Sequence, residues 1–281
     1  MKKRLILFLG IFSILSVSAL AQSPQLVKRI ITKTDSFEFG VGGTVAIAGA
    51  PNGSIRVVGS NKNVVEITAQ IELQAANESD LATLAAVTGF LTQETIGRTG
   101  IVSYGTYNRL GDKKLWKKFP KDLIGLPLRI DYVVSVPHFC DLEIDGGKGD
   151  LSISGVEGSM RINFLETNAD IAVIGGNTNV TVGGGRVKVA LGVHGWRGRS
   201  ANIQVASGEL DVELPLNVSA EIDAVILRNG AIENRLIPVL KPRDRKLPFT
   251  EKSINAKAGV GGTSLKFTVG DGTLRMNTLV D

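Results

Sequence analysis

The chain has 281 residues, a formal net charge of +5, 33 glycines and an aromatic content of only 5%. Few large rings and many glycines are typical of an all-β protein with small aliphatic cores and many turns. The single cysteine, Cys140, excludes an intramolecular disulfide, and we expect its side chain to be a small buried hydrophobe.

The first 21 residues have the three parts of a secretory signal peptide. Met1 is followed by three basic residues, an apolar run over 5–20 and the small-residue site Ala19-Leu20-Ala21. The sequence therefore predicts export to the periplasm, the cell envelope or the extracellular medium, with no membrane span left after cleavage. Three basic charges leave with the signal peptide, so the mature chain carries about +2, which gives no reason to expect a nucleic-acid partner.

After the signal peptide, the pattern predicts a polar lead-in over 22–36 and a single domain over 37–281. Gly43-Thr-Val-Ala-Ile47 near the start and Gly272-Thr-Leu-Arg-Met276 near the end share one motif, which favours one continuous domain. Strands are expected where apolar and polar residues alternate or β-prone residues cluster. In chain order these are 37–39, 43–47, 53–57, 64–71, 96–107, 128–136, 218–225, 231–237, 262–267 and 272–276.

One segment in the first half is helical in pattern. Over 77–91, Leu81, Leu84 and Leu91 recur at three- and four-residue spacing, which predicts an amphipathic helix. Asn77 stands where a side-chain cap is needed. We expect this inserted helix to pack its leucines on the β scaffold.

Two segments lack periodicity and are rich in basic residues. They cover 108–127, which contains Trp116 and Phe119, and 238–257. The sequence predicts a long exposed loop for the first and an irregular segment for the second. Because terminal strands of an open sheet invite aggregation, we expect the 77–91 helix or these basic segments to cover the ends.

Between Asp141 and Leu214 a five-residue motif recurs eight times, with aliphatic residues at its second and fourth positions. Pairs of copies repeat after 18 residues (Leu142 to Met160) or 20 residues (Met160 to Val180), which is the length of two short strands and two tight turns. The sequence predicts a single-domain right-handed parallel β-helix, or β-solenoid. The alternative is a β-sandwich of hairpins, which the spacing of single copies also permits.

Several motifs resemble those of a known family. They are Asn52-Gly-Ser-Ile-Arg-Val57, Val136-Pro137, the Gly-Asp-Leu-Ser-Ile-Ser motif at 149–154, and Ser207-Gly-Glu-Leu-Asp-Val-Glu-Leu-Pro215. The chain resembles the bacterial "putative adhesin" β-repeat family, a domain of unknown function similar to auto-transporter adhesin head domains. The resemblance covers about Phe37 to Met276. It implies a secreted or cell-envelope β-solenoid and brings no catalytic residues.

The clearest hint of an enzyme is a set of four acidic residues between Asp141 and Asp150, called the acidic set below. Polysaccharide lyases and hydrolases with β-helix folds place carboxylates on one outer face for Ca²⁺ binding or acid–base work. The interpretation that we favour is a ladder of turn residues in successive strands, which would continue through Ser159, Asp170, Asn179 and Asn202. Neither histidine has the spacing of a metal site or a nucleophile–base pair, so we predict no catalytic residue, metal or cofactor. The acidic set consists of Asp141, Glu143, Asp145 and Asp150.

Two loops combine tryptophan with basic residues. An exposed tryptophan can stack on sugars or lie at a lipid interface, and lysine and arginine attract anionic polysaccharide or phospholipid. The alternative is that both loops are solvated and their rings pack down on the protein. The candidate ligand-binding residues are Trp116, Lys117, Lys118, Trp196, Arg197 and Arg199.

The sequence thus favours a secreted or cell-envelope β-solenoid that is not an enzyme. Its expected role is adhesin-like binding to a surface or ligand, such as anionic polysaccharide, or a structural role in the envelope. The alternative is a carbohydrate-active β-helix enzyme, a lyase or hydrolase, that acts on acidic polysaccharide through the acidic set.

Overall fold

The structure is a computed structural model that describes residues 26–279, with gaps at 41, 193–197 and 237–238. Within these residues the chain is all-β, because seventeen strands form one sheet that does not close on itself and the helices are short. The predicted all-β class is therefore confirmed. The predicted signal peptide, 1–21, lies outside the described residues and stays a prediction.

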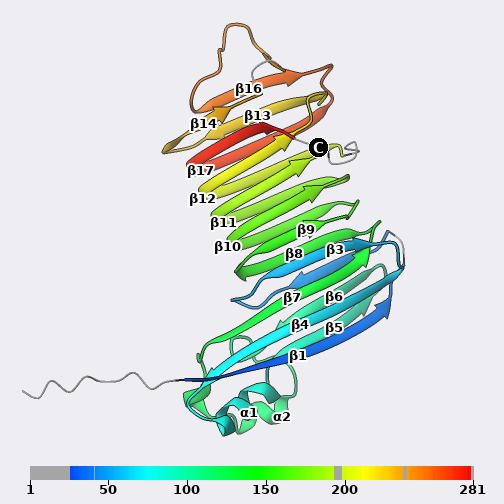
Figure 1. Ribbon diagram of the computed structural model, residues 1–281, viewed down its shortest axis with the longest axis vertical. Coiled ribbons are helices and arrows are strands. Elements are labelled where there is room, and N and C mark those ends of the chain that lie inside the picture. Colours follow the sequence, from blue (N-terminus) through cyan, green and yellow to red (C-terminus); the bar gives the residue numbers. More distant parts are fainter. Residues whose placement is uncertain (1–25, 41, 193–197, 237–238, 280–281) are drawn as a thin grey trace, which may run out of the picture.

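The centre of the sheet is a stack of parallel strands in register (Figure 1). Two shorter strands, β8 and β9, pair with the first and second halves of β10, and longer strands follow. We call the strand or strand pair at one level of this stack a rung. The central rungs contain β8 (Asp141–Lys148), β9 (Leu151–Ser154), β10 (Met160–Val173), β11 (Asn177–Leu191), β12 (Ser200–Leu214) and β17 (Thr263–Thr278).

The order of the rungs departs from the order of the chain at both ends of the stack. After β12 the chain forms β13 and β14 and then returns as β17, which lies between β12 and the β13–β14 rung. At the other end, β2 and β3 pair with β8 and β9, while the later β6 and β7 lie beyond them. These strands are β2 (Thr44–Ala48), β3 (Ile55–Ser60), β6 (Arg98–Tyr104), β7 (Leu128–Pro137), β13 (Ala220–Ile226) and β14 (Gly230–Asn234).

The core consists of columns of apolar side chains that run across the rungs. Ile162, Val180, Ile203 and Phe267 are successive partners in neighbouring strands, and each is at most 1% exposed. Burial of each such side chain contributes roughly 1.5–3 kcal/mol. The aliphatic positions of the repeated motif therefore hold the stack together.

The strand pairing corrects part of the repeat spacing. Leu142 pairs with Met160 as the 18-residue interval predicts, but Val180 pairs with Ile162 and not with Met160. The expected 20-residue alignment is thus wrong by two residues. A shift of two leaves every side chain on the same face of its strand, so alternation of apolar and polar residues cannot detect it.

Glycines form a column where the long strands bend between their two halves. Gly185, Gly208, Gly272 and Gly230 are successive partners, and all have positive φ. At Gly208, where φ is 132°, an added Cβ would lie 1.9 Å from the carbonyl oxygen of Gly185. The bend therefore requires both the left-handed backbone and the absence of a side chain.

The predicted helix is present but shorter than expected. α1 spans Glu78–Ala86, and the side chain of Asn77 caps it by accepting the amide N–H of Asp80 at 2.9 Å. The prediction for 87–91 is wrong, because β5 (Gly89–Thr95) begins there and pairs with β6. Leu91 fits the helical spacing by coincidence and lies half-exposed on β5.

Antiparallel strands cover the end of the stack that carries α1 (Figure 1). β4 (Val64–Ala75) pairs with β7, and β1 (Val27–Glu38) pairs in turn with β4. Most of the 22–36 segment that is described therefore belongs to the sheet. α1 packs against β1 and β4, as expected of a helix that shields this end.

The opposite end is covered by β15 (Leu240–Pro242) and β16 (Ser253–Ala258), with β16 antiparallel to β13. These strands lie almost entirely in the 238–257 segment, so its expected irregularity is wrong for 240–242 and 253–257 and holds for 243–252 between them. Its expected role in covering an end is confirmed. Two of the three buried side chains of β16 are alanines, Ala256 and Ala258, whose small size gives a weak alternation in the sequence.

Candidate functional site

Trp116 lies on the short helix α2 (Lys113–Lys117), at the end of the stack that carries β1 (Figure 1). Its indole N–H donates to the carbonyl of Leu110 at 3.0 Å, and its ring lies 5.0 Å from that of Phe119. Phe119 packs in turn against the core. The half-buried Trp116 ring is therefore held by its own loop and presents only part of its surface.

Part of the loop around Trp116 is ordered by apolar contacts. The 3-10 helix η1 (Lys121–Leu123) follows α2, and Leu123 is buried. The expectation of a wholly exposed loop is therefore wrong for these residues. What is exposed is a set of amines that form no ion pair within the described part of the chain. These are Lys113, Lys114, Lys117, Lys118 and Lys121.

Of the second basic loop, only its last residues are described. Trp196 and Arg197 fall outside the described residues, so their predicted role in ligand binding stays a prediction. Arg199 is exposed and directly precedes β12, where its carbonyl accepts the N–H of Ser264 at 3.3 Å. The Trp116 loop leads into β7, and β12 is the fifth strand across the sheet from β7, about 24 Å away at the usual spacing between strands. The structure does not bring Arg199 and Lys117 together.

Three of the four acidic candidates bind side chains of neighbouring rungs. Glu143 forms ion pairs with Arg98 at 2.7 Å and with Arg161 at 3.2 Å. Asp145 pairs with Arg161 at 3.1 Å and accepts from Asn163 at 2.7 Å. Asp150 accepts from an amide side chain of the next rung at 3.3 Å. These carboxylates link rungs to one another.

The electrostatics of the acidic set do not favour acid catalysis. The hydrogen bond from Arg98 lowers the pKa of Glu143, and burial opposes this only in part. At Asp145, burial raises the pKa, but Asn163 and Arg161 outweigh it and the pKa is lowered. A general acid at neutral pH needs a raised pKa, so these groups are poor candidates for that role.

Asp141 begins a ladder of polar turn residues, as expected. Its carboxylate accepts the N–H of Ser159 at 2.6 Å. The ladder continues through Asn177 and Ser200, whose side chains are 3.2 Å apart. The expected continuation through Asp170, Asn179 and Asn202 is wrong. Asp170 is the partner of Ser152 on β9, and the two-residue error in the repeat alignment puts Asn179 and its partner Asn202 inside β11 and β12.

A charged network across β12, β14 and β17 was not predicted from the sequence. Arg275 on β17 binds Glu209 at 2.9 Å, Asp211 at 3.3 Å and Glu233 at 3.2 Å. Asp211 is only 7% exposed and also pairs with Arg186 at 3.1 Å. β12 and β17 are far apart in sequence, so only their register reveals this network. Its charges compensate one another.

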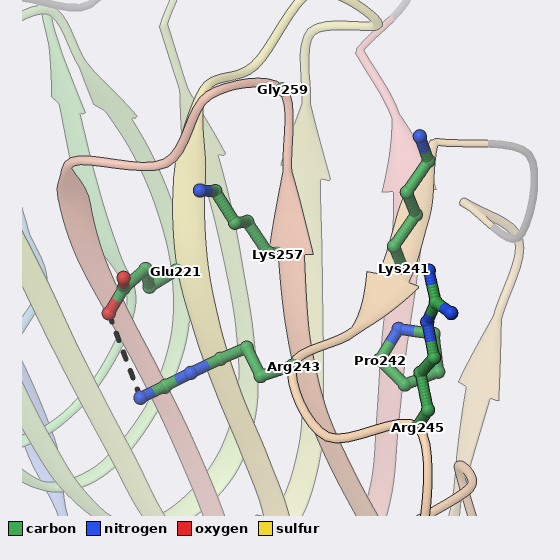
Figure 2. A pocket seen from close by; sticks show the side chains of 7 residues that line it. All are labelled: Glu221, Lys241, Pro242, Arg243, Arg245, Lys257 and Gly259. Atoms are coloured by element: carbon green, nitrogen blue, oxygen red, sulfur yellow. Dashed lines mark ion pairs between the residues drawn. The ribbon is translucent and has the colours of Figure 1, made fainter.

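A basic pocket at the β15–β16 end was also missed as a site (Figure 2). Its volume is about 460 Å³. The basic excess of 238–257 was the only signal in the sequence, and that excess alone does not show which side chains converge. The lining residues are Glu221, Lys241, Pro242, Arg243, Arg245, Lys257 and Gly259.

The described part of the chain contains neither a cluster of metal ligands nor a reactive thiol. No group of three or more His, Cys, Asp or Glu side chains is placed there to hold a metal ion. Cys140 is 2% exposed, and burial raises the pKa of its thiol to about 12. The expectation that Cys140 is a small buried side chain is confirmed. None of the described helices has the length and apolar character needed to cross a membrane.

No family model and no curated protein matches the sequence. Among solved structures, a "putative cell adhesion protein" from Clostridium sporogenes has 13% identity and a TM-score of 0.48, with 89% of this chain and 100% of that chain covered. A "putative adhesin" from Bacteroides fragilis has 12% identity and a TM-score of 0.39, with 89% and 97% covered. A "putative lipid binding protein" from Parabacteroides distasonis has 10% identity and a TM-score of 0.35, with 89% and 97% covered. At these identities and TM-scores the similarities do not establish a function.

Proposed function

We propose that the protein is an exported, non-catalytic and adhesin-like β-solenoid that binds anionic polysaccharide through the basic loop around Trp116. Parallel rungs in register, with 18 residues from β8 to β10 and from β10 to β11, support the solenoid. The predicted signal peptide supports export.

The observation that carries the proposal is the contrast between the loop and the body of the stack. On the outer face of the body, Arg161 and Arg275 are each paired with carboxylates of neighbouring rungs. Around Trp116, five exposed lysines have no such partner in the described residues. A cluster of uncompensated cations attracts polyanions and raises their rate of association.

The exposed part of the Trp116 ring adds an apolar surface for a sugar. The ring is fixed by its bond to Leu110 and its contact with Phe119, so little conformational entropy is lost when a sugar stacks on it. Charge supplies most of the attraction, and we expect the affinity to fall steeply with salt.

The test is affinity electrophoresis of the intact protein in gels that contain polygalacturonate or, as a neutral reference, dextran. The loop variant is Lys117→Glu with Lys118→Glu. The matched control is Lys62→Glu with Lys148→Glu, which changes the net charge equally at exposed lysines already paired with Glu66 and Glu166.

The loop variant should lose at least tenfold in affinity for polygalacturonate, while the control retains it. Trp116→Ala should weaken binding less, because part of the ring is already occupied by protein contacts. Equal losses in the loop variant and the control would mean that net charge alone governs binding, and the loop assignment would then be wrong.

A further inference from the structure

The basic pocket lies at the opposite end of the stack from α2, between the outer faces of β13, β15 and β16 (Figures 1 and 2). Four of its lining side chains are cationic, and Glu221 is the only acidic one. Figure 2 shows Arg243 reaching toward Glu221, with Lys241 and Arg245 on the far side of β16. The pocket thus gathers positive charge from β15, from β16 and from the turn that follows β15.

The strand register places two of these lysines opposite each other at the level of the backbone. Lys241 on β15 and Lys257 on β16 are Cα partners in an antiparallel pair, and both side chains are exposed. Like charges directly opposite one another destabilise a sheet. The pocket therefore concentrates like charge that an anionic ligand would neutralise.

The one carboxylate that lines the pocket is paired with a different cation. Glu221 on β13 is the Cα partner of Lys257, yet its carboxylate pairs with Arg243 at 3.7 Å. Arg243 also pairs with Asp223 at 3.3 Å. Within the described residues, Lys241, Lys257 and Arg245 are left without an ion pair.

The composition of the lining indicates what kind of ligand fits. No aromatic ring lines the pocket, and Pro242 is its one sizeable apolar side chain. A sugar ring or an acyl chain would find little to stack or pack on. Arginine forks and lysine amines together match the oxygens of a phosphate group, which accepts paired N–H donors and carries concentrated charge.

We propose that this pocket is a binding site for phosphate esters, carried either by a soluble molecule or by a lipid headgroup. A bound phosphate accepts hydrogen bonds from Lys241, Lys257 and Arg245 and removes the repulsion between the two lysines. The site is separate from the Trp116 loop and does not depend on the function proposed for that loop.

The repulsion gives the proposal a signature that an ordinary surface patch lacks. Lys241→Gln with Lys257→Gln should weaken phosphate binding and, without ligand, leave the midpoint of thermal unfolding unchanged or raise it. Lys246→Gln is the matched control, because this exposed lysine lies in the same segment but does not line the pocket.

The first measurement is isothermal titration of the intact protein with inorganic pyrophosphate at low ionic strength. The double variant should bind at least tenfold more weakly than the unaltered protein, with Lys246→Gln unchanged. Lys117→Glu with Lys118→Glu should also leave pyrophosphate binding unchanged, which separates this site from the Trp116 loop. No binding by the unaltered protein, or an equal loss in Lys246→Gln, would overturn the proposal.

The source of the phosphate is resolved by two further probes. Binding of glycerol phosphate in solution supports a soluble ligand. Co-sedimentation with vesicles of phosphatidylglycerol, but not of phosphatidylcholine, supports a lipid headgroup when it is lost in the double variant. Co-sedimentation that persists in the double variant contradicts the lipid source.

Discussion

Substituting alanine for Gly208 tests whether the glycine column is a requirement of the stack. The residue has φ of 132°, and a backbone forced into sparsely populated space costs roughly 1–3 kcal/mol for a residue with a side chain. The new Cβ would also lie 1.9 Å from the carbonyl oxygen of Gly185. That oxygen belongs to the neighbouring strand and cannot rotate away as a flexible side chain could.

The clash therefore adds to the cost of the backbone conformation. Forcing an atom into a closely packed position costs roughly 1–3 kcal/mol. Separating the strands locally weakens a ladder hydrogen bond worth about 1 kcal/mol. We expect Gly208→Ala to lower the free energy of unfolding by roughly 3–7 kcal/mol, a large part of the 5–15 kcal/mol that domains usually have.

Gly262 provides a matched control, because it has φ of 110° and no atom within 4 Å of the added Cβ. Gly262→Ala should lose only the backbone contribution, roughly 1–3 kcal/mol. Both variants can be measured by urea denaturation followed by far-ultraviolet circular dichroism. If the two substitutions lower the free energy of unfolding equally, close approach between strands does not explain the glycine column.

Three further predictions concern the ends, the thiol and the charged face. Ala256→Glu places a carboxylate at a 0% exposed position of β16, so it should detach that strand and increase the mass measured by light scattering, while Ser253→Glu on the exposed face should leave that mass as in the unaltered protein. The buried Cys140 should react with a thiol reagent at pH 8 only as fast as the protein unfolds; rapid labelling of the native state would contradict this. The Arg98 hydrogen bond lowers the pKa of Glu143 in the folded protein below its ordinary value of 4.5. The ionised Glu143 therefore contributes its full stabilisation at a pH above about 4.5, and this stabilisation is lost as the pH falls through the folded pKa. An NMR titration that gives Glu143 a folded pKa of 4.5 or higher would refute that assignment.

Much of the fold was predictable because the interval between copies of the repeated motif can be read directly from the sequence. Alternation identified the strands of the central rungs, and the 18-residue interval from Leu142 to Met160 matches their pairing. Alternation repeats every two residues, however, so it could not separate an alignment of 18 from one of 20. The position of β17 between β12 and β13 also leaves no local trace, because every motif of this kind fits any rung.

The candidate site was less accessible from sequence. The lysines around Trp116 are recognisable as a basic cluster, but the contacts that hold the ring depend on how the loop folds back on Leu110 and Phe119. The opposed pair Lys241 and Lys257 requires the antiparallel register of β15 and β16. β15 has only three residues, and the alanines of β16 give a weak alternation, so the sequence pattern did not reveal either strand.

The architecture itself explains why uncompensated cations occur at the ends of the stack. In the body, an outward side chain has a neighbouring rung on each side, and Arg275 on β17 accordingly pairs with carboxylates on both β12 and β14. A strand at the end has a neighbour on one side only; β15 pairs with β16 alone among the described strands. Lys241 therefore has a single row of partners, and that row presents another lysine. The same regular pairing that stabilises the body leaves few free groups for a ligand there. Positions with charge available for binding arise where the repeat stops, which is where both proposed sites lie.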